Sequence, residues 1–162
     1  MTRAGRTTVV TSSANGDANS KQRLRLWLRL LRATRFVEGE LRERLRRDFD
    51  ATLPRFDVLA ALYRVENGMT MTELSRFLMV SNGNVTGIVD RLVQEGLIVR
   101  IPDKNDRRAT FVRLTPKGLT AFTEMAEAHE GWVDGMLSEI TAEEASQLIG
   151  LLSRFNSQKE SR

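Results

Sequence analysis

The chain has 162 residues, of which 41% are apolar, so it has the size of one ordinary domain that can bury a hydrophobic core. It contains no cysteine, which excludes disulfide bonds, thiol catalysis and cysteine-based redox sensing. The net charge is +4, and Lys and Arg outnumber Asp and Glu ten to five over residues 21–53 and ten to seven over 54–118, whereas residues 119–162 carry three against eight. A polyanion such as nucleic acid suits the basic first two thirds.

Residues 1–20 are rich in Thr, Ser, Asn, Gly and Ala and have no hydrophobic period, so they predict a disordered tail. They lack the apolar stretch of a signal peptide, and no run in the chain approaches the roughly 18 apolar residues of a membrane span. We therefore expect a cytoplasmic protein without a membrane contact.

A long helix is predicted from Lys21 to about Phe49, in an N-terminal dimerisation segment that we place at 21–53, because apolar residues recur there at helical spacing without proline. Thr52 and Pro54 predict the start of a second helix, since proline suits the first helical turn. Asn67 and Gly68 predict its end.

A short helix of about two turns is predicted next, because Thr70 and Glu73 have the spacing of a capping box. After the brief link 79–80, Ser81 can cap another helix, whose apolar residues keep a 3.6-residue spacing until Gly96. Two helices therefore meet across a tight turn.

A β-hairpin with a charged tip is predicted after Gly96, because 97–101 and 110–114 are β-rich runs on either side of 102–108. Thr115 and Pro116 then open another long helix with one apolar face that continues to Ile140. A second capping box over 141–144 opens a final helix, and both helices belong to a C-terminal dimerisation segment, 119–162.

The order short helix, tight link, helix and hairpin predicts a winged helix-turn-helix over residues 54–118. The predicted fold class is mainly α with a small β-hairpin wing, the core being flanked by long dimerisation helices. A helix that enters the DNA major groove needs small polar groups on its outer face, and glycines at 83 and 87 permit close backbone approach. The predicted DNA contacts of this helix are Ser81, Asn82, Asn84, Val85, Thr86 and Arg91. The alternative is that these residue types simply cap a helix and form turns.

Three cations gather at the hairpin tip, where they can reach phosphates or enter the narrow, negatively charged minor groove. They are Lys104, Arg107 and Arg108. A solvated tip is the alternative, and the position beside a candidate recognition helix favours DNA contact.

The stretches TELSRFLMVSNGNVTGIVDRLVQEGLIVR and DKNDRRATFVRLTPKG resemble the MarR family of bacterial regulators, and with the flanking helices the resemblance covers residues 21–157. It implies a wing motif of Asp106 and Arg108, with Arg108 in the minor groove and Asp90 orienting it. It also implies a homodimer on a pseudo-palindromic operator, repression by default and release by a ligand. The residues expected to form the dimer are Leu24, Leu28, Leu148, Leu151, Leu152 and Phe155. The alternative for these faces is an intramolecular helical core.

The resemblance also implies a small anionic or phenolic effector between the dimerisation helices and the DNA-binding lobe. The expected lining is Trp27, Leu31, Arg32, Arg35, Phe36, Phe56, Leu59, Tyr63, His129 and Trp132, all of which could instead be ordinary core. Arginines are frequent in the first long helix and could receive the phosphates of a coenzyme A thioester. SNGNVTG resembles relatives that control aromatic-acid catabolism, so we expect an aromatic acid or its thioester as effector.

An enzyme is disfavoured, because the sole histidine, His129, has no nucleophile beside it in a recognisable motif. With one histidine and no cysteine, a zinc site is not expected, and neither is a cofactor. The remaining alternative is a helical dimer that binds a protein partner without binding specific DNA, for which salt-dependent DNA binding is the discriminating test.

Overall fold

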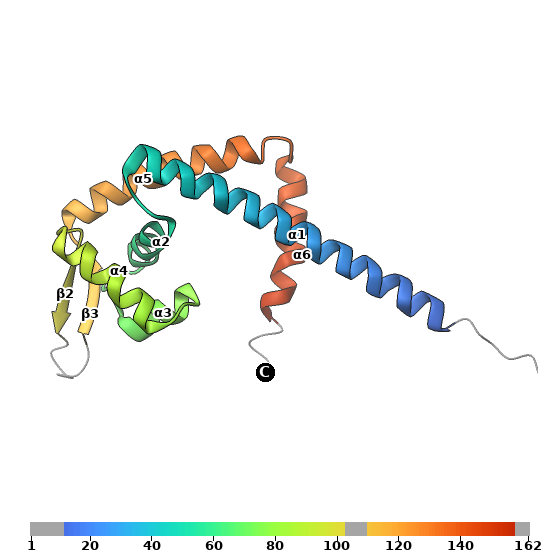
Figure 1. The fold of residues 1–162 in the computed structure, drawn as a ribbon, viewed down its shortest axis with the longest axis horizontal. Coiled ribbons are helices and arrows are strands. Elements are labelled where there is room, and N and C mark those ends of the chain that lie inside the picture. Colours follow the sequence, from blue (N-terminus) through green and yellow to red (C-terminus); the bar gives the residue numbers. More distant parts are fainter. Residues whose placement is uncertain (1–11, 103–109, 158–162) are drawn as a thin grey trace, which may run out of the picture. The chain divides into compact units, whose positions relative to one another are not determined.

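The computed structural model describes residues 12–102 and 110–157. The chain divides into two compact units, one ending at Glu40 and one beginning at Leu41, and each is described by itself. The elements in chain order (Figure 1) are α1 (Ser12–Phe49), α2 (Leu53–Tyr63), β1 (Met69–Thr70), α3 (Met71–Leu78), α4 (Asn82–Gln94), β2 (Ile98–Pro102), β3 (Thr110–Leu114), α5 (Pro116–Met136) and α6 (Ala142–Ser157). The mainly helical class with a small β-hairpin is confirmed.

Helix α1 begins at Ser12, nine residues before the predicted start, so the prediction of a disordered tail through residue 20 is wrong for 12–20. No proline interrupts this stretch, and extending an existing helix adds a backbone hydrogen bond for each residue fixed, without needing a buried face. The helix ends at Phe49 as predicted, because Asp50 has a left-handed backbone with φ of 47°.

Helix α2 begins at Leu53 with Pro54 in its first turn, but it ends at Tyr63 rather than at Asn67–Gly68. Gly68 does not end a helix, but allows β1 to approach β3. Its φ is +83°, and a Cβ there would lie 2.4 Å from the carbonyl oxygen of Val112 on β3. Glycine is therefore required where β1 approaches β3.

The predicted capping box at α3 is confirmed in both directions. The backbone N–H of Glu73 donates to Thr70 Oγ1 at 3.2 Å, and the backbone N–H of Thr70 donates to Glu73 Oε2 at 2.8 Å. These hydrogen bonds hold the pKa of Glu73 below its usual value. The second box is also present, between Thr141 and Glu144 at the start of α6.

The strands form a three-stranded antiparallel sheet in the order β1-β3-β2. The hairpin is confirmed, with Ile98 opposite Leu114 and Pro102 opposite Thr110. The two-residue strand β1 was not predicted, because two residues are too few for the alternation that identifies a strand. It places Met69 opposite Val112, which closes the α2–α3 connection onto the hairpin.

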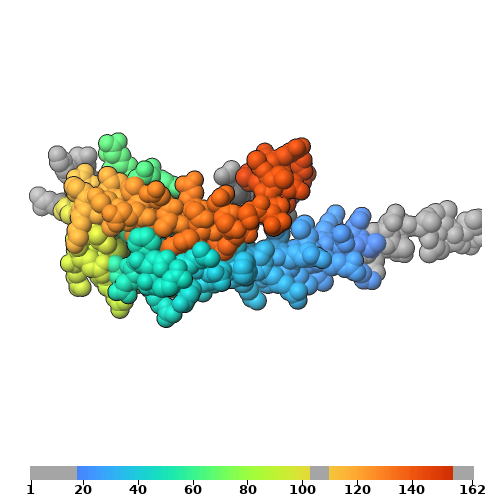
Figure 2. Space-filling model, turned by 90° about the horizontal axis from the view of Figure 1, so that it is seen from above, coloured from blue at the N-terminus to red at the C-terminus, as the bar shows by residue number. Residues whose placement is uncertain are grey.

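The core lies where α2 packs against α3, α4, α5 and β3. Its largest fully buried side chains are Leu45, Leu59, Leu74, Leu92, Ile98, Val58, Val85, Val89 and Val112. Helix α2 packs directly against α5, whose surface is orange in Figure 2. Helix α5 ends at Met136, so the predicted continuation to Ile140 is wrong: Leu137 leaves the helical conformation and residues 137–140 form a turn.

Candidate nucleic-acid interface

Helix α4 presents two chemically different faces. Val85, Val89 and Leu92 are each 0% exposed and fix the helix on the core. The polar residues at its start are all exposed: Ser81, Asn82, Asn84 and Thr86. The inclusion of Val85 among the DNA contacts was therefore wrong, because a side chain with no accessible surface cannot touch a base.

The first turn of α4 keeps its polar groups largely free of the protein's own fold. Ser81 occupies the N-cap position but makes no side-chain capping hydrogen bond. The Thr86 hydroxyl donates to the Asn82 carbonyl oxygen at 2.8 Å, and the Thr86 residue remains exposed. A Cβ at Gly83 or Gly87 would meet no atom within 4 Å, so packing in this chain does not require these glycines, and both leave room for close approach by another molecule.

Asp90 of α4 is held by a residue that sequence reasoning missed. Arg100 Nη2, on β2, donates to Asp90 Oδ1 at 2.6 Å, and both side chains are partly exposed. The ion pair ties the predicted recognition helix to the first strand of the wing. The available signal was a cation in the β-rich run that follows the helix of Asp90, ten residues further along the chain.

The wing tip lies outside the described residues. The predicted contacts Lys104, Asp106, Arg107 and Arg108 are in 103–109, so the expectation that Asp90 orients Arg108 stays a prediction. Arg91 is described and exposed on α4.

A second ion pair fixes the other end of α4. Arg55 at the start of α2 pairs with both carboxylate oxygens of Glu95, the C-cap of α4, with Arg55 Nη1 2.9 Å from Oε1. Lys117 Nζ donates to the carbonyl oxygen of Glu95 at 2.8 Å. The recognition helix is thus held at its apolar face, at Asp90 and at its C-terminus, which is the rigidity that positioned base contacts need.

Part of the predicted effector lining forms an aromatic cluster along α2 and α5. Phe56 stacks on His129 with ring centroids 4.6 Å apart, and Phe122 lies 5.6 Å from Phe56 and 4.9 Å from Tyr63. Trp132 packs edge-on against Phe49 at 6.1 Å. Burial lowers the pKa of His129 below its usual value, which favours neutral imidazole.

Phe56 and Leu59 are almost fully buried, which is the behaviour of core residues, whereas Tyr63 is exposed and His129 and Trp132 are partly exposed. Leu59 also lines a pocket of about 230 Å³ together with Arg55 and Met125. The remaining predicted lining residues lie on α1 before Glu40. Of these, Trp27, Arg32, Arg35 and Phe36 are exposed, and Leu31 is partly exposed.

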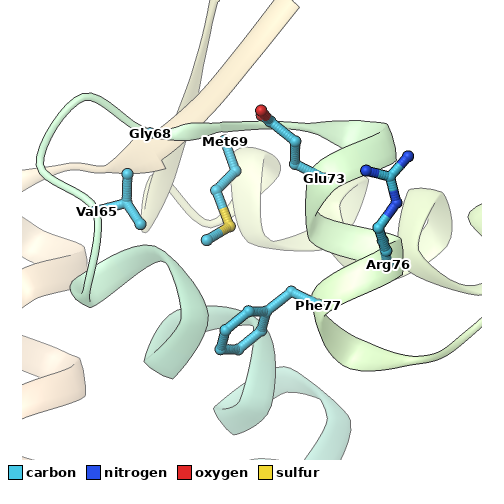
Figure 3. A pocket seen from close by; sticks show the side chains of 6 residues that line it. All are labelled: Val65, Gly68, Met69, Glu73, Arg76 and Phe77. Atoms are coloured by element: carbon cyan, nitrogen blue, oxygen red, sulfur yellow. The ribbon is translucent and has the colours of Figure 1, made fainter. Parts of the chain in front are cut away.

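A pocket of about 380 Å³ that was not predicted lies between the α2–β1 turn and α3. It is lined by Val65, Gly68, Met69, Glu73, Arg76 and Phe77. Figure 3 shows Met69 and Phe77 pointing toward one another across it. The guanidinium carbon of Arg64 lies 6.0 Å from the centroid of the Phe77 ring. This pocket is apolar with charged groups at its rim.

The predicted dimerisation residues are exposed where they are described. Leu24 and Leu28 on α1 are 57% and 47% exposed, and Leu148, Leu151 and Leu152 on α6 are 43–51% exposed. Phe155 belongs to α6, but its side chain lies outside the described residues. Their exposure is compatible with dimerisation, and their role in it stays a prediction.

The arrangement defines a class of protein: a winged-helix DNA-binding protein, with a polar recognition helix, a hairpin beside it and long helices before and after. Within the described residues there is no group of three or more side chains that could hold a metal ion, and no helix long and apolar enough to cross a membrane.

Comparison with known proteins identifies the family. The MarR family model matches residues 51–110. The transcriptional activatory protein BadR of Rhodopseudomonas palustris is 34% identical over 129 residues, which are 74% of this chain and 68% of that protein.

Two solved structures share the fold. The regulator BldR of Sulfolobus solfataricus has a TM-score of 0.76 at 28% identity and covers 85% of this chain and 96% of its own. A mutant MarR from E. coli complexed with operator DNA has a TM-score of 0.72 at 27% identity and covers 83% of this chain and 95% of its own. The chain belongs to the MarR family and is a DNA-binding transcriptional regulator.

Proposed function

We propose that this protein is a dimeric repressor that binds a pseudo-palindromic operator through α4 and the wing and is released by a small anionic aromatic ligand or its coenzyme A thioester. We further propose that it controls the catabolism of aromatic compounds. The observation that carries the proposal is the division of α4: Val85, Val89 and Leu92 are fully buried, while Ser81, Asn82 and Asn84 are all exposed.

That division supports base reading in the major groove. Asparagine amides can donate and accept in pairs toward adenine, and serine and threonine hydroxyls can contact any base. The base-reading groups occupy the first turn of α4, the part of a recognition helix that meets base edges in helix-turn-helix proteins. The ion pairs of Asp90 with Arg100 and of Glu95 with Arg55 support a helix held in one register.

A homodimer is supported by the exposed leucines of α6. Covering these apolar side chains with another apolar surface removes them from water, which is favourable. Two recognition helices one DNA turn apart also require two copies of a chain that carries one such helix. The two-fold symmetry of the dimer then predicts the symmetry of the operator.

An aromatic effector is supported by the rings along α2 and α5. Phe56 stacks on His129, and the exposed ring of Tyr63 and the partly exposed rings of His129 and Trp132 offer stacking surface near a titratable nitrogen. The thioester is supported by the arginines of α1, because a thioester adds phosphate charges that a free acid lacks. These arginines are all exposed: Arg23, Arg25, Arg29, Arg32 and Arg35.

Activation is the second candidate, and the name of the relative BadR, a transcriptional activatory protein, favours it. DNA binding by α4 is common to both candidates. They differ in whether transcription of the target genes rises or falls when the gene for this protein is deleted, and transcript levels in such a strain decide between them.

DNA binding is tested by selecting fragments of the source genome with the purified protein and measuring their affinity at several salt concentrations. We expect a small set of two-fold symmetric fragments, an affinity that falls steeply with salt, and a weaker complex for Asn84→Ala. Binding that ignores sequence and responds equally to every variant would instead favour the partner-binding alternative. The genes beside the selected fragments would show whether aromatic catabolism is controlled.

The effector is tested with matched aromatic acids and thioesters in gel shifts and calorimetry. A ligand releases DNA only if it binds the free protein more tightly than the complex, and by linkage the two affinities differ by the factor by which it weakens DNA binding. If the free acid releases DNA as well as its thioester does, the arginines of α1 have another role.

A further inference from the structure

The turn between α3 and α4 contains a methionine in a backbone conformation that suits glycine. Met79, the C-cap of α3, has φ of 55° and ψ of 36°. Among the described residues only Asp50 is also a non-glycine residue with positive φ. The left-handed conformation places Cβ too close to the following carbonyl, so any side chain here costs free energy relative to glycine.

Backbone hydrogen bonds explain why residue 79 has a left-handed conformation, but they do not explain why the residue is methionine. The N–H of Met79 donates to the Arg76 carbonyl oxygen at 3.2 Å, and the N–H of Val80 donates to the Ser75 carbonyl oxygen at 3.1 Å. These bonds end α3 and reverse the chain within two residues, and helix ends of this kind use glycine by preference. The fold therefore specifies a left-handed residue and would be served better by glycine.

Nothing in the described part of the chain compensates for the methionine. Its side chain is 80% exposed, the largest exposed fraction among the large apolar side chains of the described residues. It buries little apolar surface, so it contributes little to folding. A strained and exposed apolar side chain points to a contact outside the chain.

The position identifies the partner of that contact. Met79 lies two residues before Ser81, the N-cap of α4, and Val80 shares the lining of a cleft of about 400 Å³ with Asn84 and Ile88. The apolar surface of the turn is thus continuous with the polar face proposed to read bases. In the major groove the apolar group on a base edge is the C5 methyl of thymine.

We propose that Met79 contacts a thymine methyl group at the edge of each operator half-site and makes that position selective for thymine. The inference rests on the proposed function of α4 as recognition helix. The flexible thioether side chain suits a shallow apolar contact of this kind. The turn between α3 and α4 would then recognise the thymine methyl group, and α4 would recognise bases through hydrogen bonds.

Replacing thymine by uracil deletes the methyl group and keeps every base-pair hydrogen bond. The experiment measures the dissociation constants of wild type and Met79→Gly for the selected operator and for versions with each thymine replaced in turn. We expect one replacement per half-site to weaken wild type about fourfold, the factor for one buried methyl group, and to leave Met79→Gly unaffected. On the natural operator, Met79→Gly should bind about fourfold more weakly per half-site.

Two variants serve as controls. Met79→Gly should melt no lower than wild type, because glycine relieves the left-handed strain, and Met79→Leu should keep its preference for thymine. Asp50→Gly relieves the same strain between α1 and α2 and should leave operator affinity unchanged.

Equal affinity of Met79→Gly and wild type, or an equal response of both to every uracil replacement, would overturn this inference. If Asn84→Ala is weakened in the same assay, the proposed role of α4 survives that result. If Asn84→Ala also binds like wild type, the recognition-helix proposal fails and this inference with it.

Discussion

Helices α4 and α6 are both amphipathic, but their apolar faces have opposite fates. On α4 Val85, Val89 and Leu92 are completely buried by the rest of the chain, and the polar face remains accessible. On α6 Leu148, Leu151 and Leu152 stay about half exposed. The apolar face of α4 is covered by the same chain, and the exposed surface of this helix is polar. The apolar face of α6 is not fully covered, so this helix exposes an apolar surface. The difference matches the proposed roles, DNA binding for α4 and dimerisation for α6.

The sharpest way to break this comparison is to make the α6 surface polar. Leu148→Asp combined with Leu152→Asp places charges on the apolar face, and we expect a monomer. Losing the second half-site contact should weaken operator binding by about 10²–10⁴-fold. Sedimentation and gel shifts measure both effects. Gln147→Asp, which adds a charge beside the apolar face, is the matched control, and a double variant that stays dimeric would place the interface elsewhere.

Truncation of an apolar side chain on α4 should reduce the stability of the folded chain and should not affect dimerisation directly. Leu92→Ala removes a fully buried side chain, and we expect a loss of about 2–5 kcal/mol in the free energy of unfolding. Urea denaturation measures it. Leu151→Ala on α6 should cost far less per chain at concentrations where the protein is monomeric. Similar costs at both positions would remove the distinction between the two helices.

The third prediction concerns the wing, whose tip lies outside the described residues. Arg108→Ala should weaken specific DNA binding by about 1–3 kcal/mol while leaving dimerisation and melting unchanged, because a minor-groove contact is made only in the complex. Arg46→Ala, which removes the same charge from α1, is the control. Wild-type affinity in Arg108→Ala would refute the wing assignment.

The ion pair beside α4 allows a finer test. Because Asp90 and Arg100 are partly exposed, removing either should change the free energy of unfolding by less than about 1 kcal/mol. Asp90→Ala should still weaken DNA binding, by less than Arg108→Ala. A double-mutant cycle separates the roles of Asp90. If Asp90 acts only through Arg100, the double variant binds DNA like Arg100→Ala, and any further loss measures an effect on Arg108.

The smallest expected effect concerns pH. Burial lowers the pKa of His129 from its ordinary value of 6.5, so the folded state takes up this proton less readily than the unfolded chain. The contribution of His129 to stability is therefore greatest above pH 6.5 and declines as the pH falls below it. His129 is the single histidine of the chain. His129→Gln should therefore reduce the change in the free energy of unfolding between pH 7.5 and 5.5, as measured by denaturation curves. An unchanged slope would show that other groups cause it.

Local patterns predicted most of the fold. Both capping boxes form between the residues whose spacing indicated them, Thr70 with Glu73 and Thr141 with Glu144. The hairpin partners also lie where the β-rich runs placed them. These features depend on side chains a few residues apart, which is why the sequence alone revealed them.

Predictions failed where a distant segment decides the role of a residue. Gly68 reads as a helix stop, but its conformation serves the approach of β1 to β3. That outcome does not follow from neighbours in sequence. Val85 is a different case: it was included among the DNA contacts, although its helical spacing with Ile88, Val89 and Leu92 already predicts the inner face, where the structure buries it.

The sequence by itself determined the winged helix-turn-helix and the polar composition of its recognition helix, because hydrophobic spacing and caps act within a few residues. Only the tertiary structure decided which cation holds Asp90, which apolar faces are covered and which are left for a partner, and that Met79 is strained and exposed beside α4. These properties depend on contacts between segments far apart in the chain, and on surface that remains after folding, neither of which a linear pattern contains.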